Sequence, residues 1–545
     1  MMRLSSGEAL MGTLGAMQDF PLRIMRLMDH AEREHGSREI VAARADGTTV
    51  RRNWKQLADD ARRMGQALER LGVQPGERVA TLAMNHDRHL AAWFGVVGMG
   101  GVLHTLNPRL FDDQLAYIAT HAEDRVLLYD AAFEDLVQRM KPHWPTIRHY
   151  VRFDDQFDDW LAAETGDYCW YEGDEREPCG LCYTSGTTGH PKGVLYEHRS
   201  TVLHAMSVIA PDIFDVSARS AMLPVVPMFH ANSWCIPYAA AIAGFKLVVC
   251  SDNQPERLCQ LFNEEGITHT AGVPTVWLGM IDHVERTGAE LGKLRLVIIG
   301  GSSAPPATIR WFRERGIHVN HLWGMTEMSP VGTVGAPPAN WDEMSDDEQV
   351  DYMSRPGRSM FGVELRTVDA QGNPLPRDGK SSGKLQTRGP AVVRRYFKQE
   401  QDACDEGQWF DTGDMAAIHP DGTIQITDRA KDVIKSGGEW ISSIELENAA
   451  VGCPGVAEAA AIGVPHPKWD ERPLLLVVPD AGAKLCQAEL RSYLSGQVAK
   501  WWLPDAIEFV EELPHTATGK LSKKDLRDKY RDYRFPEAVQ MVGRD

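Results

Sequence analysis

The 545-residue chain contains few cysteines, no long hydrophobic run and no excess of basic residues, and each of these absences excludes a class of protein. Nine cysteines are too few for a disulfide scaffold of this length, so we expect a reducing compartment. The apolar stretch at 239–250 contains Lys246 and is much shorter than the roughly 20 residues of a membrane span. The net charge of −18, from 58 basic and 76 acidic residues, argues against general nucleic-acid binding.

The N-terminal segment lacks the features of a targeting sequence. It contains no long apolar stretch and carries Glu8 and Asp19, which fit neither a secretory signal nor a transit peptide. We therefore expect a cytoplasmic protein without an integral membrane segment. Cys179 and Cys182 form a C-x-x-C, but no second Cys or His pair is near them in the sequence. Two small apolar residues that enter a strand are a better interpretation than zinc ligands.

The first four hundred or so residues alternate helical and extended patterns. Apolar residues at helical spacing predict a helix over 54–73, and a buried strand follows at 79–84. Another strand is expected at 296–299, followed by a Gly-Gly-Ser-Ser turn and a helix from about Pro306. Strands that alternate with helices predict parallel sheets, with ligands at the carboxyl ends of the strands.

The remaining sequence predicts a loop and a second domain. The polar, acidic segment 336–356 is expected to be an exposed loop, and Asp421-Gly422 predicts a hairpin turn. Beyond residue 428, apolar and helical stretches predict a compact α+β module of about 115 residues. Those stretches lie at 456–464, 474–478, 489–502 and 522–533. We predict an α/β fold with a large domain, residues 1–430, and a small α+β domain, residues 431–545.

The most specific local pattern is a loop rich in Gly, Ser and Thr at 183–193, YTSGTTGHPKG. Glycine allows the backbone to approach an anion closely, and successive amides and hydroxyls donate hydrogen bonds to phosphate oxygens. Lys192 adds a positive charge. The loop is not a Walker A motif, because Gly193 follows the lysine where Ser or Thr is required. Taken alone, the pattern also fits a loop without function, since these residues are common in loops.

This loop resembles the phosphate loop of the adenylate-forming superfamily, which includes acyl-CoA synthetases, luciferases and nonribosomal adenylation domains. Seven further segments resemble motifs of that family, in the family's order and over nearly the whole chain. They are Pro227-Met228-Phe229-His230, 300–305 (GGSSAP), 323–327 (WGMTE), 409–414 (WFDTGD), Arg429-Ala430-Lys431, 435–440 (KSGGEW) and Thr518-Gly519-Lys520. The resemblance implies a large domain of parallel-sheet layers with a small β-barrel-like part, and a mobile C-terminal domain hinged at Lys431.

The resemblance also implies a reaction in two steps and four catalytic residues. ATP and a carboxylic acid give acyl-AMP and pyrophosphate, and CoA then gives acyl-CoA and AMP. Lys520 would bring the carboxylate to the α-phosphate, since opposite charges about 4 Å apart attract by roughly 4 kcal/mol at an effective dielectric of 20. Glu327 would hold Mg²⁺, Thr326 would bind phosphate, and His230 would act as a gate near the carboxylate. From charge alone, Lys520 would be an ordinary surface lysine.

The nucleotide site follows from the same resemblance. Trp323 would stack on adenine, Asp414 would accept the ribose hydroxyls, and Arg429 would reach the ribose or a phosphate. Without the resemblance these would be a core aromatic, a turn aspartate and an interdomain ion pair. The residues assigned to ATP and AMP are Thr184, Ser185, Gly186, Thr187, Thr188, Lys192, Gly301, Ser302, Ser303, Trp323, Gly324, Met325, Thr326, Asp414 and Arg429.

The C-terminal domain would carry the CoA site. After it turns about Lys431, it would withdraw Lys520 and present another segment to the thiol. The residues assigned to CoA are Lys435, Gly437, Gly438, Glu439 and Trp440. The paired glycines would let the backbone approach the pantetheine arm, although a β-turn explains them equally well. Mg²⁺, ATP and CoA are the expected cofactors, and a homodimer is the default for a large enzyme.

The acyl pocket is assigned to His230, Trp234, Gly300 and Gly324. His230 stands where adenylation domains have an aspartate for the amino group, so a simple acid is favoured. Gly324 stands where acetate activators have tryptophan, which favours a chain longer than acetate. The sequence resembles bacterial medium-chain fatty acyl-CoA ligases most, through 103–110, 181–183 and 223–228. We predict a medium-chain acid. Alternatives are 3-methylmercaptopropionate, another short acid or an aryl acid, and also a non-CoA adenylating enzyme or a luciferase-like oxygenase.

Overall fold

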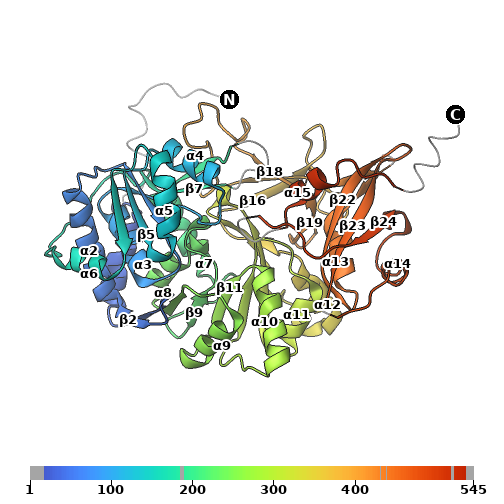
Figure 1. Cartoon of the computed structure of the whole chain (residues 1–545), viewed down its shortest axis with the longest axis horizontal. Coiled ribbons are helices and arrows are strands. Elements are labelled where there is room, and N and C mark those ends of the chain that lie inside the picture. Colours follow the sequence, from blue (N-terminus) through green and yellow to red (C-terminus); the bar gives the residue numbers. More distant parts are fainter. Residues whose placement is uncertain are drawn as a thin grey trace.

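Four β-sheets organise the chain. The computed structural model describes residues 17–184, 190–429, 431–436, 439–480, 482–516 and 521–535, without the side chains of Asp155, Asn232, Glu439 and Trp440. These residues form sheets of six, nine, four and five strands. In Figure 1 the five-stranded sheet, coloured orange and red, lies to one side of the other three. The predicted mixed α/β fold with a separate C-terminal domain is confirmed.

The six-stranded sheet has five parallel strands and one antiparallel edge strand, β8. In spatial order its strands are β6 (His149–Phe153), β5 (Val126–Asp130), β3 (Arg78–Leu82), β4 (Val102–Thr105), β7 (Pro178–Tyr183) and β8 (Gly193–Glu197). The helices of this part of the chain are α2 (Trp54–Arg70), α3 (Asp87–Gly98), α4 (Asp112–Ala122), α5 (Glu134–Met140) and α6 (Asp155–Ala162). The predicted helix over 54–73 is α2. Its N-cap residue is Asn53, whose side chain accepts a hydrogen bond from the Gln56 amide.

The nine-stranded sheet has a parallel centre of six strands and antiparallel strands at both edges. In spatial order its strands are β15 (Arg358–Ser359), β14 (Val331–Val334), β13 (His318–Gly324), β12 (Leu296–Ile299), β11 (His269–Gly272), β9 (Ala221–Pro224), β10 (Lys246–Cys250), β1 (Glu39–Ala43) and β2 (Thr49–Asn53). Its helices are α1 (Ile24–Glu34), α7 (His198–Val208), α8 (Ile236–Ala243), α9 (Pro255–Glu264), α10 (Pro274–Thr287), α11 (Pro306–Arg313) and α12 (Asp346–Ser354). Strand β12 and the start of α11 lie where the sequence predicted them.

The two smaller sheets follow in the chain. The small β part of the large domain is an antiparallel sheet of β16 (Glu364–Val368), β17 (Gly383–Arg388), β18 (Phe410–Ile418) and β19 (Ile424–Arg429). The C-terminal sheet contains β20 (Ile434–Ser436), β21 (Glu439–Ile441), β22 (Val456–His466), β23 (Asp470–Pro479) and β24 (Ala506–Phe509). It is accompanied by α13 (Ser443–Val451), α14 (Gln487–Leu494) and α15 (Lys523–Lys529). The helix predicted over 489–502 is wrong beyond residue 494, where α14 ends.

The expectation of an exposed loop over 336–356 is also wrong in part. Residues Asp346–Ser354 form α12, which begins at a capping box between Ser345 and Glu348. Val350, Tyr352 and Met353 of this helix are buried. The acidic residues of the segment suggested a solvated loop, but three apolar side chains on one helix are enough to dock it on the domain.

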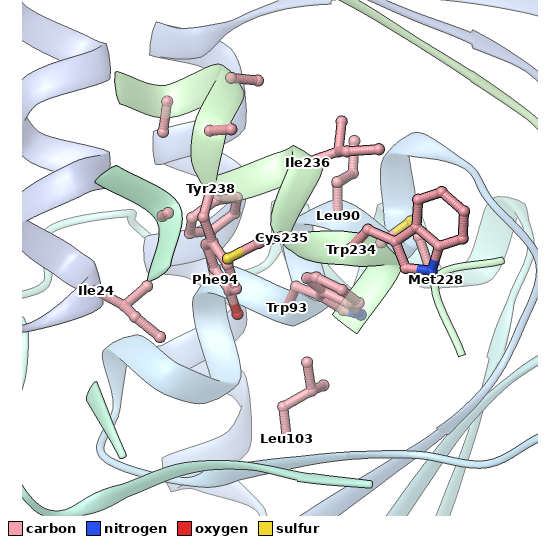
Figure 2. Close-up of a cluster of buried hydrophobic side chains, with 14 of the residues drawn as sticks. Ile24, Leu90, Trp93, Phe94, Leu103, Met228, Trp234, Cys235, Ile236 and Tyr238 are labelled. Carbon is pink, nitrogen blue, oxygen red and sulfur yellow. The ribbon is translucent and has the colours of Figure 1, made fainter. Parts of the chain in front are cut away.

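Helix α3 lies in the main hydrophobic core, and all of its residues are buried. Figure 2 shows Phe94 of α3 beside Tyr238 of α8, and Leu90 of α3 beside Ile236 of α8. The ring centroid of Tyr238 is 5.7 Å from those of both Trp93 and Phe94. Such aromatic contacts add to the stabilisation from apolar burial. Among the described residues, no helix combines the length and hydrophobicity that a bilayer crossing requires.

Replacing Phe94 with alanine should destabilise the large domain. The ring is fully buried between Trp54 and Tyr238, so its removal leaves a cavity and should cost about 3–5 kcal/mol. Phe111→Ala is the matched control, because that ring is 77% exposed and its loss should cost under about 0.5 kcal/mol. Urea unfolding followed by tryptophan fluorescence measures both midpoints, and equal shifts would contradict this account of the core.

Candidate functional site

The glycine-rich loop leaves the carboxyl end of β7 and returns at β8. Its ends are joined by a hydrogen bond of 2.9 Å from the Thr184 amide to the Lys192 carbonyl. The Lys192 ammonium lies 4.7 Å from the centre of the Tyr396 ring. The predicted Ser185, Gly186, Thr187 and Thr188 lie outside the described residues. The predicted lysine therefore stands at a strand end, where open α/β sheets bind their ligands.

The Thr326-Glu327 turn follows directly after β13. Tyr396 donates a hydrogen bond of 2.8 Å to Oε1 of Glu327, and Tyr196 of β8 donates one of 2.7 Å to the Thr326 carbonyl. The Val393 amide donates to the Glu327 carbonyl at 2.7 Å. The Glu327 residue is 7% exposed. Burial raises the pKa of both tyrosines above the usual range, which keeps their hydroxyls protonated as donors.

Trp323, Asp414 and Arg429 meet at the end of β13. The Trp323 indole N–H donates a hydrogen bond of 2.8 Å to Oδ2 of Asp414. The Arg429 guanidinium lies 3.7 Å from Oδ1 of the same carboxylate, and the two residues are partners across β18 and β19. Asp414 therefore contacts both of the other residues predicted to bind the nucleoside, and the Trp323 indole also acts as a donor, which the sequence did not suggest.

The structure gives a reason for glycine at position 324 that the sequence did not suggest. A Cβ at this position would lie 1.9 Å from the Pro330 carbonyl oxygen, so the hairpin of β13 and β14 requires glycine. The Met325 amide donates a hydrogen bond of 2.9 Å to the same carbonyl. The geometry of the hairpin is therefore enough to explain glycine at this position, with no need for a substrate pocket. The acyl-pocket role of Gly324 stays a prediction.

Gly300 and Trp234, both assigned to the acyl pocket, lie together at the end of β12. A Cβ on Gly300 would lie 2.4 Å from Cδ1 of Leu322 and 3.0 Å from the Trp234 indole. Trp234 is buried, and Figure 2 shows it beside Met228 at the edge of the aromatic cluster. His230 is half-buried, and its amide donates a hydrogen bond of 3.1 Å to the Pro227 carbonyl. The two predicted walls of the acyl pocket therefore touch each other.

The segment that carries Trp234 is strained. Ala231, Ser233, Trp234 and Cys235 have φ angles of 39°, 47°, 51° and 66°, in the left-handed region. The left-handed conformation costs each residue with a Cβ roughly 1–2 kcal/mol of conformational energy. Backbone strain of this kind is concentrated at functional sites, where the surrounding structure maintains it.

The Gly301-Ser302-Ser303 loop contacts the C-terminal domain. Asn448 of α13 donates a hydrogen bond of 3.1 Å to the Ser303 hydroxyl. Gly301 has a φ of 90°, which only glycine adopts readily. The loop between the predicted adenine and acyl sites is therefore also a point where the two domains meet.

The predicted CoA residues lie in and around β20 and β21. Lys435 is exposed and pairs with Trp440 across these strands, while Ser436 pairs with Glu439. The predicted hinge residue Lys431 is exposed just before them. Gly437, Gly438 and the predicted catalytic lysine Lys520 lie outside the described residues. Their roles stay predictions.

A buried polar network beside the hinge was not predicted. Oδ2 of Asp428 accepts hydrogen bonds from the Ser443 amide at 2.6 Å and the Ser443 hydroxyl at 2.7 Å. Lys523 pairs with Glu447 at 2.8 Å, and burial raises the pKa of Glu447 to about 7. The network joins β19, α13 and α15, three elements that are distant in the sequence. Tyr396 and Tyr196 were missed for the same reason, because nothing in their spacing relates them to Glu327.

Comparison with known proteins identifies the family. A family model described as AMP-binding enzyme matches residues 28–397, and one described as AMP-binding enzyme C-terminal domain matches residues 445–520. The chain is similar to the 3-methylmercaptopropionyl-CoA ligase of Ruegeria lacuscaerulensis, with 48% identity over 95% of this chain and 99% of the relative. It is also similar to the medium-chain-fatty-acid–CoA ligase of Ectopseudomonas oleovorans, with 43% identity over 95% of this chain and 98% of the relative.

A solved structure agrees with these relatives. ATP-bound MatB from Rhodopseudomonas palustris superposes with a TM-score of 0.82 and 26% identity, over 94% of this chain and 99% of that one. The predicted superfamily and the predicted AMP-forming acid–CoA ligase are confirmed at this level. The first family model covers more than half of the chain, and the second follows it in the C-terminal domain. These matches show that this chain belongs to the AMP-binding enzyme family.

Proposed function

We propose that this acid–CoA ligase activates a linear aliphatic acid of short to medium length. One observation carries the proposal. Tyr396 contacts both Lys192 and Glu327. Trp323, in the strand that ends just before Glu327, donates a hydrogen bond to Asp414. These groups follow the order of the parts of a bound ATP molecule: the lysine would meet the phosphates, the buried carboxylate their Mg²⁺, and Asp414 the ribose. The contact of Gly300 with Trp234 lies at the neighbouring strand end and provides the acyl wall.

Each nucleotide contact has a physical basis. Lys192, with the loop that precedes it, would neutralise the terminal phosphates. Asp414 offers two carboxylate oxygens to the ribose hydroxyls, and Arg429 balances its charge. Trp323 presents a ring to adenine while its N–H holds Asp414 in place. Gly301, Ser302 and Ser303 would separate the adenine from the acyl chain.

The single buried carboxylate of Glu327 fits Mg²⁺ better than a metal ion that needs several protein ligands. Among the described residues, no three His, Cys, Asp or Glu side chains gather in a metal-binding cluster. Mg²⁺ keeps several waters and binds through one or two carboxylates together with substrate phosphates. The buried Glu327 carboxylate would hold the ion, which would supply charge neutralisation to the phosphates.

No side-chain nucleophile is required, because ATP, the acid and the CoA thiol supply the reacting groups. The work of the protein is to position charges and exclude water. We place the domain boundary at residues 430 and 431 and the hinge at Lys431. In one arrangement Lys520 would approach the carboxylate and the α-phosphate. In the other, the segment with Lys435, Gly437, Gly438, Glu439 and Trp440 would face the thiol.

Two kinds of acid fit a pocket wall made of Gly300, Leu322 and Trp234. Medium-chain fatty acids and 3-methylmercaptopropionate are both linear and carry no charge beyond the carboxylate. The relative with 48% identity is named for the thioether acid, and the relative with 43% identity is named for medium-chain acids. The Trp234 indole lies directly against Gly300, which leaves little width beside this wall and favours a linear chain over an aryl ring.

Pyrophosphate release should distinguish the acids. We expect the highest kcat/KM with butyrate to octanoate or with 3-methylmercaptopropionate, and values at least about tenfold lower with acetate, because each buried methylene contributes about 0.8 kcal/mol. Benzoate should also be poor, since the wall is narrow. A preference for benzoate would refute the linear-acid proposal, and the absence of pyrophosphate release with every acid would refute adenylation.

Lys520→Ala should separate the two half-reactions. We expect acyl-AMP formation to fall by at least about a thousandfold, because no other group is assigned to join the two anions. Thioester formation from supplied acyl-AMP should continue. Lys484→Ala is the matched control, since this lysine is an exposed side chain of the same domain. Equal loss of both half-reactions would contradict the role given to Lys520.

Trp323→Phe should weaken recognition of the ribose. The substitution keeps an aromatic ring but removes the N–H that orients Asp414, so kcat/KM for ATP should fall about five- to tenfold. The loss should be smaller with 2′-deoxy-ATP, which has one hydroxyl fewer to offer Asp414. Trp311→Phe is the control, because that indole donates to Glu285 at 2.6 Å elsewhere. An unchanged preference for ATP over 2′-deoxy-ATP in Trp323→Phe would show that the hydrogen bond has no part in ribose binding.

A further inference from the structure

We propose that Tyr396 is a positioning residue that couples the phosphate-binding lysine to the carboxylate that holds magnesium. The proposal rests on the proposed function, because it takes Lys192 and Glu327 as the ATP and Mg²⁺ residues. Tyr396 lies in the segment between β17 and β18, and none of the family-like motifs in the sequence includes it. Its two contacts point to two different effects, one from the hydroxyl and one from the ring.

The hydroxyl acts on Glu327. It donates a hydrogen bond of 2.8 Å to Oε1 and so fixes the plane of the carboxylate. Groups that hydrogen-bond a metal ligand orient it, and their removal usually costs 10- to 100-fold in metal affinity. A carboxylate already held in one orientation loses less freedom when the cation arrives. The hydroxyl therefore favours Mg²⁺ binding without touching the ion.

The ring acts on Lys192. The ammonium lies 4.7 Å from the ring centre, within the range of a cation–π contact. A lysine side chain is long and flexible, so a partner that holds its head group reduces the entropy lost when phosphate binds. One side chain thus sets the positions of a cation and an anion that must both meet the same triphosphate.

The backbone around Tyr396 supports this role. Val393 donates to the Glu327 carbonyl at 2.7 Å, and Phe397 donates to the Gly193 carbonyl at 2.8 Å. The segment is therefore fastened on one side to the Glu327 turn and on the other to the end of the glycine-rich loop. Tyr196 donates its hydrogen bond to the backbone of the turn, at the Thr326 carbonyl, whereas Tyr396 donates to the Glu327 side chain, so the two tyrosines have different tasks.

The test measures ATP binding by calorimetry without any acid, over a series of Mg²⁺ concentrations. Tyr396→Phe keeps the ring and loses the hydroxyl. It should raise the Mg²⁺ concentration for half-maximal ATP binding about tenfold, while ATP affinity without Mg²⁺ stays within about twofold. Tyr396→Leu loses both groups. It should show the same Mg²⁺ shift and also bind ATP about threefold or more weakly without Mg²⁺.

Controls distinguish positioning from general damage. Lys141 lies 4.7 Å from the Tyr150 ring, in a part of the six-stranded sheet that the proposed site does not use. Tyr150→Phe and Tyr150→Leu should therefore leave both quantities unchanged. In a Glu327→Gln background, Tyr396→Phe should add no further Mg²⁺ shift, because the hydroxyl acts through that carboxylate.

Each outcome bears on one part of the proposal. An unshifted Mg²⁺ dependence in Tyr396→Phe would overturn the role of the hydroxyl. Equal ATP affinity of the Phe and Leu variants without Mg²⁺ would overturn the role of the ring. Failure of the proposed function would look different, since the unaltered protein would then not bind ATP at all. Tyr396→Phe is nearly isosteric, so it tests the hydroxyl even if Tyr396→Leu does not fold.

Discussion

The mutual repulsion of two anions, the triphosphate of ATP and the carboxylate of the acid, is the constraint on which the proposed site depends. Like charges about 4 Å apart repel by roughly 4 kcal/mol at an effective dielectric of 20. Among the residues that we assign to ATP and Mg²⁺, the two cations Lys192 and Arg429 are balanced by the two anions Glu327 and Asp414. A net positive charge must therefore come from elsewhere, and Mg²⁺ and a lysine of the C-terminal domain are its proposed sources.

A lysine delivered by another domain requires a contact that forms and breaks readily. The described contacts between α13 and the large domain are polar, such as Asn448 with Ser303 and Ser443 with Asp428. Each face of the C-terminal sheet has its own apolar core, so these contacts are not needed to fold the domain. Polar interfaces between domains exchange their hydrogen bonds for water at small cost. The structure is thus consistent with a domain that turns as a unit about Lys431.

Local patterns in the sequence predicted helix α2, strand β12, the start of α11 and the general alternation of strands and helices in the large domain. They failed where burial depends on distant partners. Segment 336–356 looked like a loop because its acidic residues hid the three apolar side chains that dock α12. The pattern around Gly324 gave no sign that the hairpin also requires glycine there, where a Cβ would lie 1.9 Å from the Pro330 carbonyl oxygen. Tyr396 carried no signal, because only the fold brings it to Lys192 and Glu327.

In the proposed acyl pocket, chain-length preference would depend on a balance between backbone strain and burial. Left-handed backbone at Ala231, Ser233, Trp234 and Cys235 costs roughly 1–2 kcal/mol per residue, which the burial of these side chains must offset. The indole held this way rests on Gly300. A wall formed by one side chain on a strained turn moves more easily than one formed by a strand. Since each methylene contributes about 0.8 kcal/mol, a small shift of that turn would change which acid the proposed pocket prefers.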